Sequence, residues 1–175
     1  MSGMNKVMEA LGALAAGAQA ADTRAGSDPL KGADASQRDN WFKESPDRWQ
    51  AVVTLEWGGD RSLASELETV IKDADASQWP ALEKDLLKVL SNKDCSDVGR
   101  AWVCRMLRLI GSEACVAALD PLLADAKQAD WARYALERIP GAKVDAALAG
   151  ALGKLEGDAR KGLEGTIAAR KQFGV

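Results

Sequence analysis

Apolar residues in the C-terminal half of the chain form two sets that repeat at a constant offset of 29 positions. The recurring pairs are Trp102 and Trp131, Leu107 and Leu136, Ile110 and Ile139, Cys115 and Val144, Ala118 and Ala147, Leu119 and Leu148, Leu122 and Ala151, and Leu123 and Leu152. The spacing within each set follows the helical period. Self-similarity at this length predicts stacked helical repeats, because one pair of helices cannot bury its apolar faces without a neighbouring pair.

The same periodicity, read together with capping and helix-breaking residues, predicts eight helices between residues 46 and 171. The first begins at Pro46 and ends before Gly58, the second is capped by Asp60, and the third opens at Ser77 with Pro80 in its first turn. The others are predicted at 97–110, 113–124, 129–139, 143–155 and 158–171. Because the connections are short, consecutive helices should be antiparallel. The predicted fold class is all-α, an α-solenoid of about four stacked antiparallel helix hairpins spanning residues 46–175.

Residues 1–21 have two interpretations. Lys6, the small and apolar run 7–17 and the sequence Ala18-Gln19-Ala20 follow the order of a secretory signal, although Glu9 is costly inside such a run. The same stretch also carries an apolar helical stripe, which predicts a packed terminal amphipathic helix instead. Residues 22–45 are rich in Gly, Ala, Ser and Asp and are predicted to be a flexible linker. The chain is expected to be exported or periplasmic if residues 1–21 are a signal peptide, and cytoplasmic otherwise.

Composition mainly argues against particular kinds of site and function. The chain has 175 residues, 47% of them hydrophobic, and can therefore bury a sizeable core. It has no histidine and its three cysteines form no CxxC pair, so we expect no metal site, no cofactor and no enzymatic activity. Cys104 and Cys115 occupy apolar helical positions and are predicted to be buried. No stretch reaches the roughly 18 apolar residues of a membrane span.

Two consecutive stretches, 102–125 (WVCRMLRLIGSEACVAALDPLLAD) and 132–155 (ARYALERIPGAKVDAALAGALGKL), carry a resemblance to a known family. They resemble the HEAT-repeat domain, in the short form related to phycobilin-lyase repeats that occurs in large exported proteins of planctomycete-type bacteria. The resemblance extends over residues 49–170, and the stretch 55–61 (LEWGGDR) is similar to the opening of that domain. It implies an α-solenoid used for protein interaction, without catalytic residues of its own. The blurred signal-like segment and the end of the chain after the eighth helix depart from the family pattern.

Charge is distributed unevenly along the chain. Residues 1–97 contain 11 basic and 17 acidic residues, whereas residues 98–175 contain 12 and 9, so the repeat half is mildly basic. The predicted fourth, sixth and eighth helices carry the basic residues Arg100, Arg105, Arg108, Arg133, Arg138, Arg160, Lys161, Arg170 and Lys171. Such a stripe has two interpretations: a solvated face with ion pairs inside the array, to Asp120, Asp125, Asp130, Glu137 and Asp145, or a binding surface for an anionic partner.

Aromatic residues add two local features. Trp102 and Trp131 occupy the same repeat position, where packing against a neighbouring hairpin is the simplest explanation; exposed, they would be binding anchors. The cluster 57–61 (WGGDR) lacks the spacing of a phosphate loop and is predicted to be a tight turn between helices.

The hypothesis from the sequence is a non-enzymatic protein–protein interaction scaffold built from HEAT-like repeats. Its predicted contact residues are Arg105, Arg108, Arg133 and Arg138 on the second helix of each hairpin. The alternative is a nucleic-acid-binding helical repeat that uses the same basic face. A more remote alternative, suggested by the phycobilin-lyase kinship, is an accessory subunit in bilin attachment.

Overall fold

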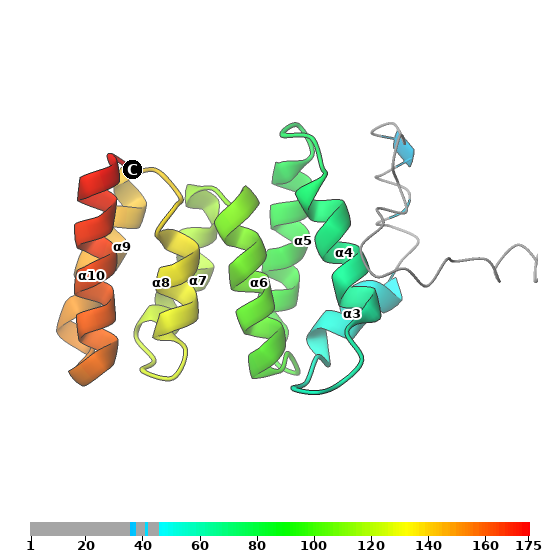
Figure 1. The fold of residues 1–175 in the computed structure, drawn as a ribbon. Helices are drawn as coiled ribbons and strands as arrows, with labels where there is room; N and C mark the ends of the chain where they lie inside the picture. The colour runs from blue at the N-terminus through cyan, green and yellow to red at the C-terminus, as the bar shows by residue number, and fades with distance from the viewer. Residues whose placement is uncertain (1–35, 38–40, 42–45) are drawn as a thin grey trace, which may run out of the picture.

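A computed structural model describes residues 36–37, 41 and 46–175, and these residues form helices, turns and loops but no strand (Figure 1). The helices are α3 (Pro46–Val53), α4 (Ser62–Lys72), α5 (Trp79–Ser91), α6 (Asp97–Ile110), α7 (Val116–Leu123), α8 (Ala129–Leu136), α9 (Ala142–Ala151) and α10 (Gly157–Phe173). Short 3-10 turns, η1 (Glu113–Cys115) and η2 (Leu152–Lys154), precede α7 and follow α9. The all-α prediction is confirmed. The interpretations of segments 1–21 and 22–45 lie outside the described residues, apart from 36–37 and 41.

The helices are arranged in two rows (Figure 1). Consecutive helices contact each other in the pairs α3/α4, α5/α6, α7/α8 and α9/α10. In addition, each of α4, α6 and α8 contacts the next even-numbered helix, and each of α3, α5 and α7 contacts the next odd-numbered one. In Figure 1 the even-numbered helices stand in front, and we call their solvent side the second-helix face.

The core follows the apolar pattern of the sequence. It is a single cluster of buried side chains that runs from Val52 in α3 to Leu163 in α10. Trp102 is 3% exposed, whereas its counterpart Trp131 is partly buried and packs against the edge of the core. No helix among the described residues has the length and apolar content needed to cross a membrane.

Several predicted helix boundaries are wrong. α3 ends at Val53, well before Gly58, and the Leu55 backbone N–H then donates to the Val52 carbonyl; the residue immediately before α4 is Arg61 rather than Asp60. Ser77 does not open α5, because residues 75–78 already form a turn in which the Gln78 backbone N–H donates to the Asp75 carbonyl, and α5 continues from it at Trp79. α8 ends at Leu136, three residues early. The helical conformation is disfavoured at the residue that precedes Pro140, so the chain leaves the helix before it.

Hydrogen bonds from the start of one hairpin to a glutamate of the preceding hairpin join successive hairpins. The Glu83 carboxylate, 5% exposed on α5, accepts bonds of 2.8 Å from both the backbone N–H and the hydroxyl of Ser112, which opens the next hairpin. One repeat later Glu113 accepts the backbone N–H of Lys143 at 2.9 Å. Because these acceptors satisfy N–H groups that a helix start leaves free, they fix the position of each hairpin on the preceding one.

Candidate protein-binding surface

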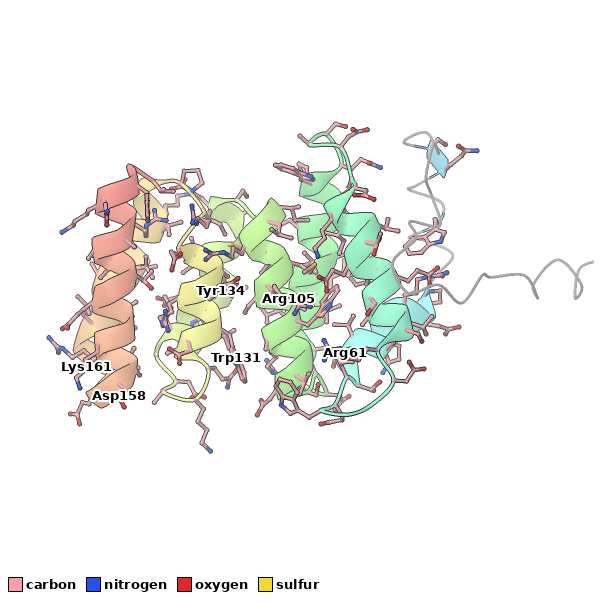
Figure 2. All side chains as sticks on the ribbon, viewed as in Figure 1. Arg61, Arg105, Trp131, Tyr134, Asp158 and Lys161 are labelled. Atoms are coloured by element: carbon pink, nitrogen blue, oxygen red, sulfur yellow. The ribbon has the colours of Figure 1, made fainter. Side chains whose placement is uncertain are left out.

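The four arginines predicted as contact residues all lie on the second-helix face. Arg105 and Arg108 belong to α6, Arg133 belongs to α8, and Arg138 follows α8. Figure 2 shows Arg105 beside Tyr134 and Trp131 of α8, on adjacent helices in the middle of the view. The structure therefore places three of the predicted residues on two neighbouring helices of one row and Arg138 in the turn after the second of them.

Arg105 is already engaged in an ion pair. Its guanidinium lies 2.5 Å from a Glu68 carboxylate oxygen on α4, and Lys72 lies 2.6 Å from the other oxygen. Burial by itself would raise the pKa of Glu68, but the hydrogen bonds and charges of Lys72 and Arg105 outweigh it and lower that pKa. The Arg105 side chain remains 43% exposed. It can therefore contact a further partner while it shares the Glu68 carboxylate with Lys72.

Arg108 and Arg138 converge on one carboxylate. Arg108 bonds Glu137 at 2.9 Å and the Tyr134 backbone carbonyl at 2.7 Å, while Arg138 lies 3.8 Å from the same Glu137 oxygen. The two guanidiniums also lie over aromatic rings, Arg108 at 4.1 Å from the Tyr134 centroid and Arg138 at 5.4 Å from that of Phe173. These contacts orient both arginines and leave Tyr134 43% and Phe173 61% exposed.

The remaining basic residues of the stripe mostly serve the fold. Arg133 pairs with Asp130 at 2.7 Å, and the same kind of local pairing holds for Arg160 with Glu164 and for Lys161 with Asp158. Arg100 donates to the carbonyls of Leu90, Asn92 and Cys95 around the end of α5. Arg170 is buried and pairs with Asp145. The interpretation of the stripe as intra-array pairs thus describes most of its members, and Arg105 and Arg138 are the more exposed of the four predicted contacts.

Tyr134, Phe173 and Leu109 are the residues of this surface that the sequence argument missed. Leu109 is 47% exposed and follows Arg105 by four positions, so the two share one side of α6. A signal was present for Tyr134, because it lies 29 positions after Arg105, the offset of the repeat itself. Arg108 and Glu137 are separated by the same 29 positions and are in contact. Residues at the repeat offset are therefore neighbours on adjacent hairpins.

The cysteines offer no accessible thiolate. Cys95, Cys104 and Cys115 are free and buried, as predicted for the latter two. Burial raises the pKa of Cys104 and of Cys115 to about 12. Residues 36–37, 41 and 46–175 bring together no group of three potential metal-ligating side chains. The feature that the described residues do supply is a surface with exposed aromatic and arginine side chains.

We expect Cys104 and Cys115 to react with iodoacetamide at pH 8 at least about a hundredfold more slowly in the folded chain than in urea, since the thiolate is the nucleophile. Above about pH 9 the unfolded chain releases thiol protons that the folded chain keeps, so stability should fall with rising pH between about 9 and 12. Mass spectrometry of time-quenched samples would measure the labelling. Stoichiometric labelling of either thiol before unfolding would contradict the burial of both.

Comparison with known proteins adds no relative. No family model, curated protein or solved structure matches the chain. The resemblance to HEAT-like repeats therefore rests on the residues of this chain alone.

Proposed function

We propose that the chain is a HEAT-like α-solenoid that acts as a non-enzymatic scaffold and binds a protein partner on the second-helix face. Support for the solenoid comes from the contacts of each helix with the next helix of its own row, in addition to its hairpin partner. The observation that carries the functional proposal is the pairing of exposed aromatic rings with oriented arginines, Tyr134 with Arg108 and Phe173 with Arg138.

The chemistry of this face favours a protein partner. Tyrosine and arginine are the residues most enriched where alanine substitution costs binding energy in protein interfaces. Ion pairs and ring contacts already restrict the guanidiniums of Arg108 and Arg138, so ordering them on binding should cost little entropy. The partner would place an apolar or aromatic side chain against Tyr134 and polar acceptors near Arg105 and Arg138.

Nucleic acid is the second candidate, because residues 98–175 carry a net charge of 12 − 9 = +3. Nucleic acid, however, gains affinity when unpaired cations of the protein displace the counterions bound to its phosphates. On this face Glu68, Asp130 and Glu137 already pair with Arg105, Arg133 and Arg108, which leaves fewer free cations for a polyanion, although Glu68 is shared with Lys72 and Glu137 with Arg138. A role in bilin attachment gains no support, since all three cysteines are buried.

The test is capture by the immobilised chain, with chemical crosslinking, from extracts of the native organism. We expect a defined partner to be retained and Tyr134→Ala/Arg138→Ala to reduce its recovery at least about tenfold. Both side chains are substantially exposed, so this variant should keep the far-UV spectrum and nearly the same Tm. Lys84→Ala, an exposed change on α5 in the other row, is the matched control. Equal recovery by all three proteins would refute this surface as the binding site.

A parallel measurement separates the two candidates. Binding of a duplex and of a single-stranded DNA is measured by fluorescence anisotropy at low and at physiological salt. The scaffold proposal expects no binding tighter than about 10 µM at low salt. Tighter binding that weakens steeply with salt would instead support the nucleic-acid function.

A further inference from the structure

Trp57 is the most exposed large apolar side chain among residues 46–175, with 83% of its surface accessible. It lies in the turn between α3 and α4, away from the aromatic residues of the second-helix face. The Trp57 ring does not contribute to the core, because it belongs neither to the core cluster nor to the residues packed against that cluster. A fully solvated tryptophan keeps a large apolar area in water, which a binding partner would remove.

The turn that carries Trp57 is fixed on both sides. Before it, Leu55 is buried and its carbonyl accepts a 2.5 Å bond from the Ser96 hydroxyl on the next hairpin. After it, Gly58 has a φ of +77°, which favours glycine, and the Gly59 N–H donates to the Glu56 carbonyl at 3.2 Å. The ring is therefore presented from an anchored backbone, which reduces the entropy lost on binding.

A shallow hollow of about 190 Å³ opens on the same turn. Its lining residues are Ala51, Thr54, Glu56, Gly59, Asp60, Ser62 and Leu63. Leu63 is itself 37% exposed, so the hollow combines an apolar wall with two carboxylates. Its size fits the end of one side chain rather than a cofactor.

Charge around the turn is negative. In the first hairpin Arg48 pairs with Glu66 and Lys72 with Glu68. In the turn itself Glu56 and Asp60 make no ion pair with any described residue, and Arg61 is the cation next to Asp60. The Ser62 backbone N–H donates to the Asp60 carboxylate at 2.8 Å and lowers its pKa. The complementary ligand is therefore a cation with an apolar stem.

We propose that the α3–α4 turn is a second docking site, which takes a basic peptide segment of a protein partner. A lysine or arginine of that segment stacks on the Trp57 indole, its charge faces Glu56, and a neighbouring side chain enters the hollow beside Leu63. Tryptophan is the best aromatic partner for such a cation. The contact is small, so the complex is transient and its affinity falls with salt. The site is independent of the second-helix face.

The test is a nuclear magnetic resonance titration of the full chain with a capped Gly-Arg-Gly-Arg-Gly-Arg peptide. The Trp57 indole N–H signal is assigned by its loss in Trp57→Phe. We expect this signal to shift and saturate with a Kd below about 1 mM, and an otherwise identical glutamate peptide to leave it unmoved. Trp57→Ala should weaken binding about tenfold and Glu56→Gln about threefold.

Two matched variants separate this site from others. Trp79→Ala removes the other substantially exposed indole of the described residues, at the start of α5, and should leave the affinity unchanged. Tyr134→Ala, on the second-helix face, should also leave it unchanged. An unmoved Trp57 signal at about 5 mM peptide, equal affinity in Trp57→Ala, or loss of binding in Tyr134→Ala would each overturn the proposal. Failure of partner capture on the second-helix face would not affect it.

Discussion

Replacing Arg170 with alanine should lower the free energy of unfolding by about 3 kcal/mol. The side chain is only 1% exposed. Its Nη1 donates to the carbonyls of Leu136 at 2.7 Å and Ile139 at 2.6 Å, and its Nε donates to Asp145 at 2.8 Å. Leu136 is the last residue of α8 and its carbonyl also accepts the Ile139 backbone N–H at 3.3 Å, whereas the Ile139 carbonyl lies beyond the helix, where no helical N–H is left to satisfy it. Alanine would leave the Ile139 carbonyl without its Arg170 donor, would leave the Leu136 carbonyl only its longer bond from Ile139, and would create a cavity between α8, α9 and α10.

Two further variants identify which bonds matter. Asp145 is 58% exposed, so Asp145→Ala should cost less than about 1 kcal/mol. Arg170→Lys keeps the charge but not the planar set of donors, and it should recover only part of the stability. Urea denaturation followed by circular dichroism would give the three values. Equal losses for Arg170→Ala and Asp145→Ala would show that the ion pair, and not the carbonyl contacts, dominates.

Gly99→Ala should destabilise the chain by about 3 kcal/mol, although alanine is intrinsically the better helix residue. Gly99 lies in α6, and a Cβ atom there would overlap the Val52 backbone carbonyl of α3 and lie 3.0 Å from the Cys95 sulfur. A backbone atom cannot rotate aside, so α6 would have to move away from α3. That movement would strain the bonds of Ser96 to the carbonyls of Val53 and Leu55.

Gly165→Ala provides the matched control for this close approach. Gly165 lies inside α10, and a Cβ added there meets no atom within 4 Å. Without a steric cost, the helix preference of alanine should stabilise this variant by about 0.5–1 kcal/mol. Thermal and urea unfolding of both variants would measure the difference in sign. Stabilisation by Gly99→Ala would mean that α3 and α6 are not in contact at this position.

Several features of the fold could be predicted from local sequence because they depend on local physics. The helical period identified buried positions in both copies of the repeat, such as Leu107 and Leu136 or Leu119 and Leu148. The prediction at Ser77 was wrong because a preceding turn already provides carbonyl acceptors for the backbone N–H groups at the start of α5. The sequence did not reveal that turn, because it forms only when residues 75–78 adopt the turn conformation jointly and no single residue among them indicates it.

The candidate surface was predicted less completely. The sequence placed Arg105 and Arg138 on one face, but a charged side chain looks alike in sequence whether it is solvated, paired or buried. Arg105 pairs with Glu68, 37 positions away, and this separation matches no repeat offset. Exposure of Trp57 was equally invisible, because tryptophan in a helical protein is normally expected in the core.

The sequence by itself determined that this chain is helical, the order and approximate positions of its helices, and most of the apolar residues of the core, because amphipathic periodicity acts over a few residues. Tertiary structure decided what each charged and aromatic side chain does. It buried Arg170 against the end of α8, balanced Arg108 with Glu137 and left Trp57 in solvent. Those outcomes depend on the distance between helices that are neighbours in space, and desolvation and ion pairing are fixed only when that distance is set.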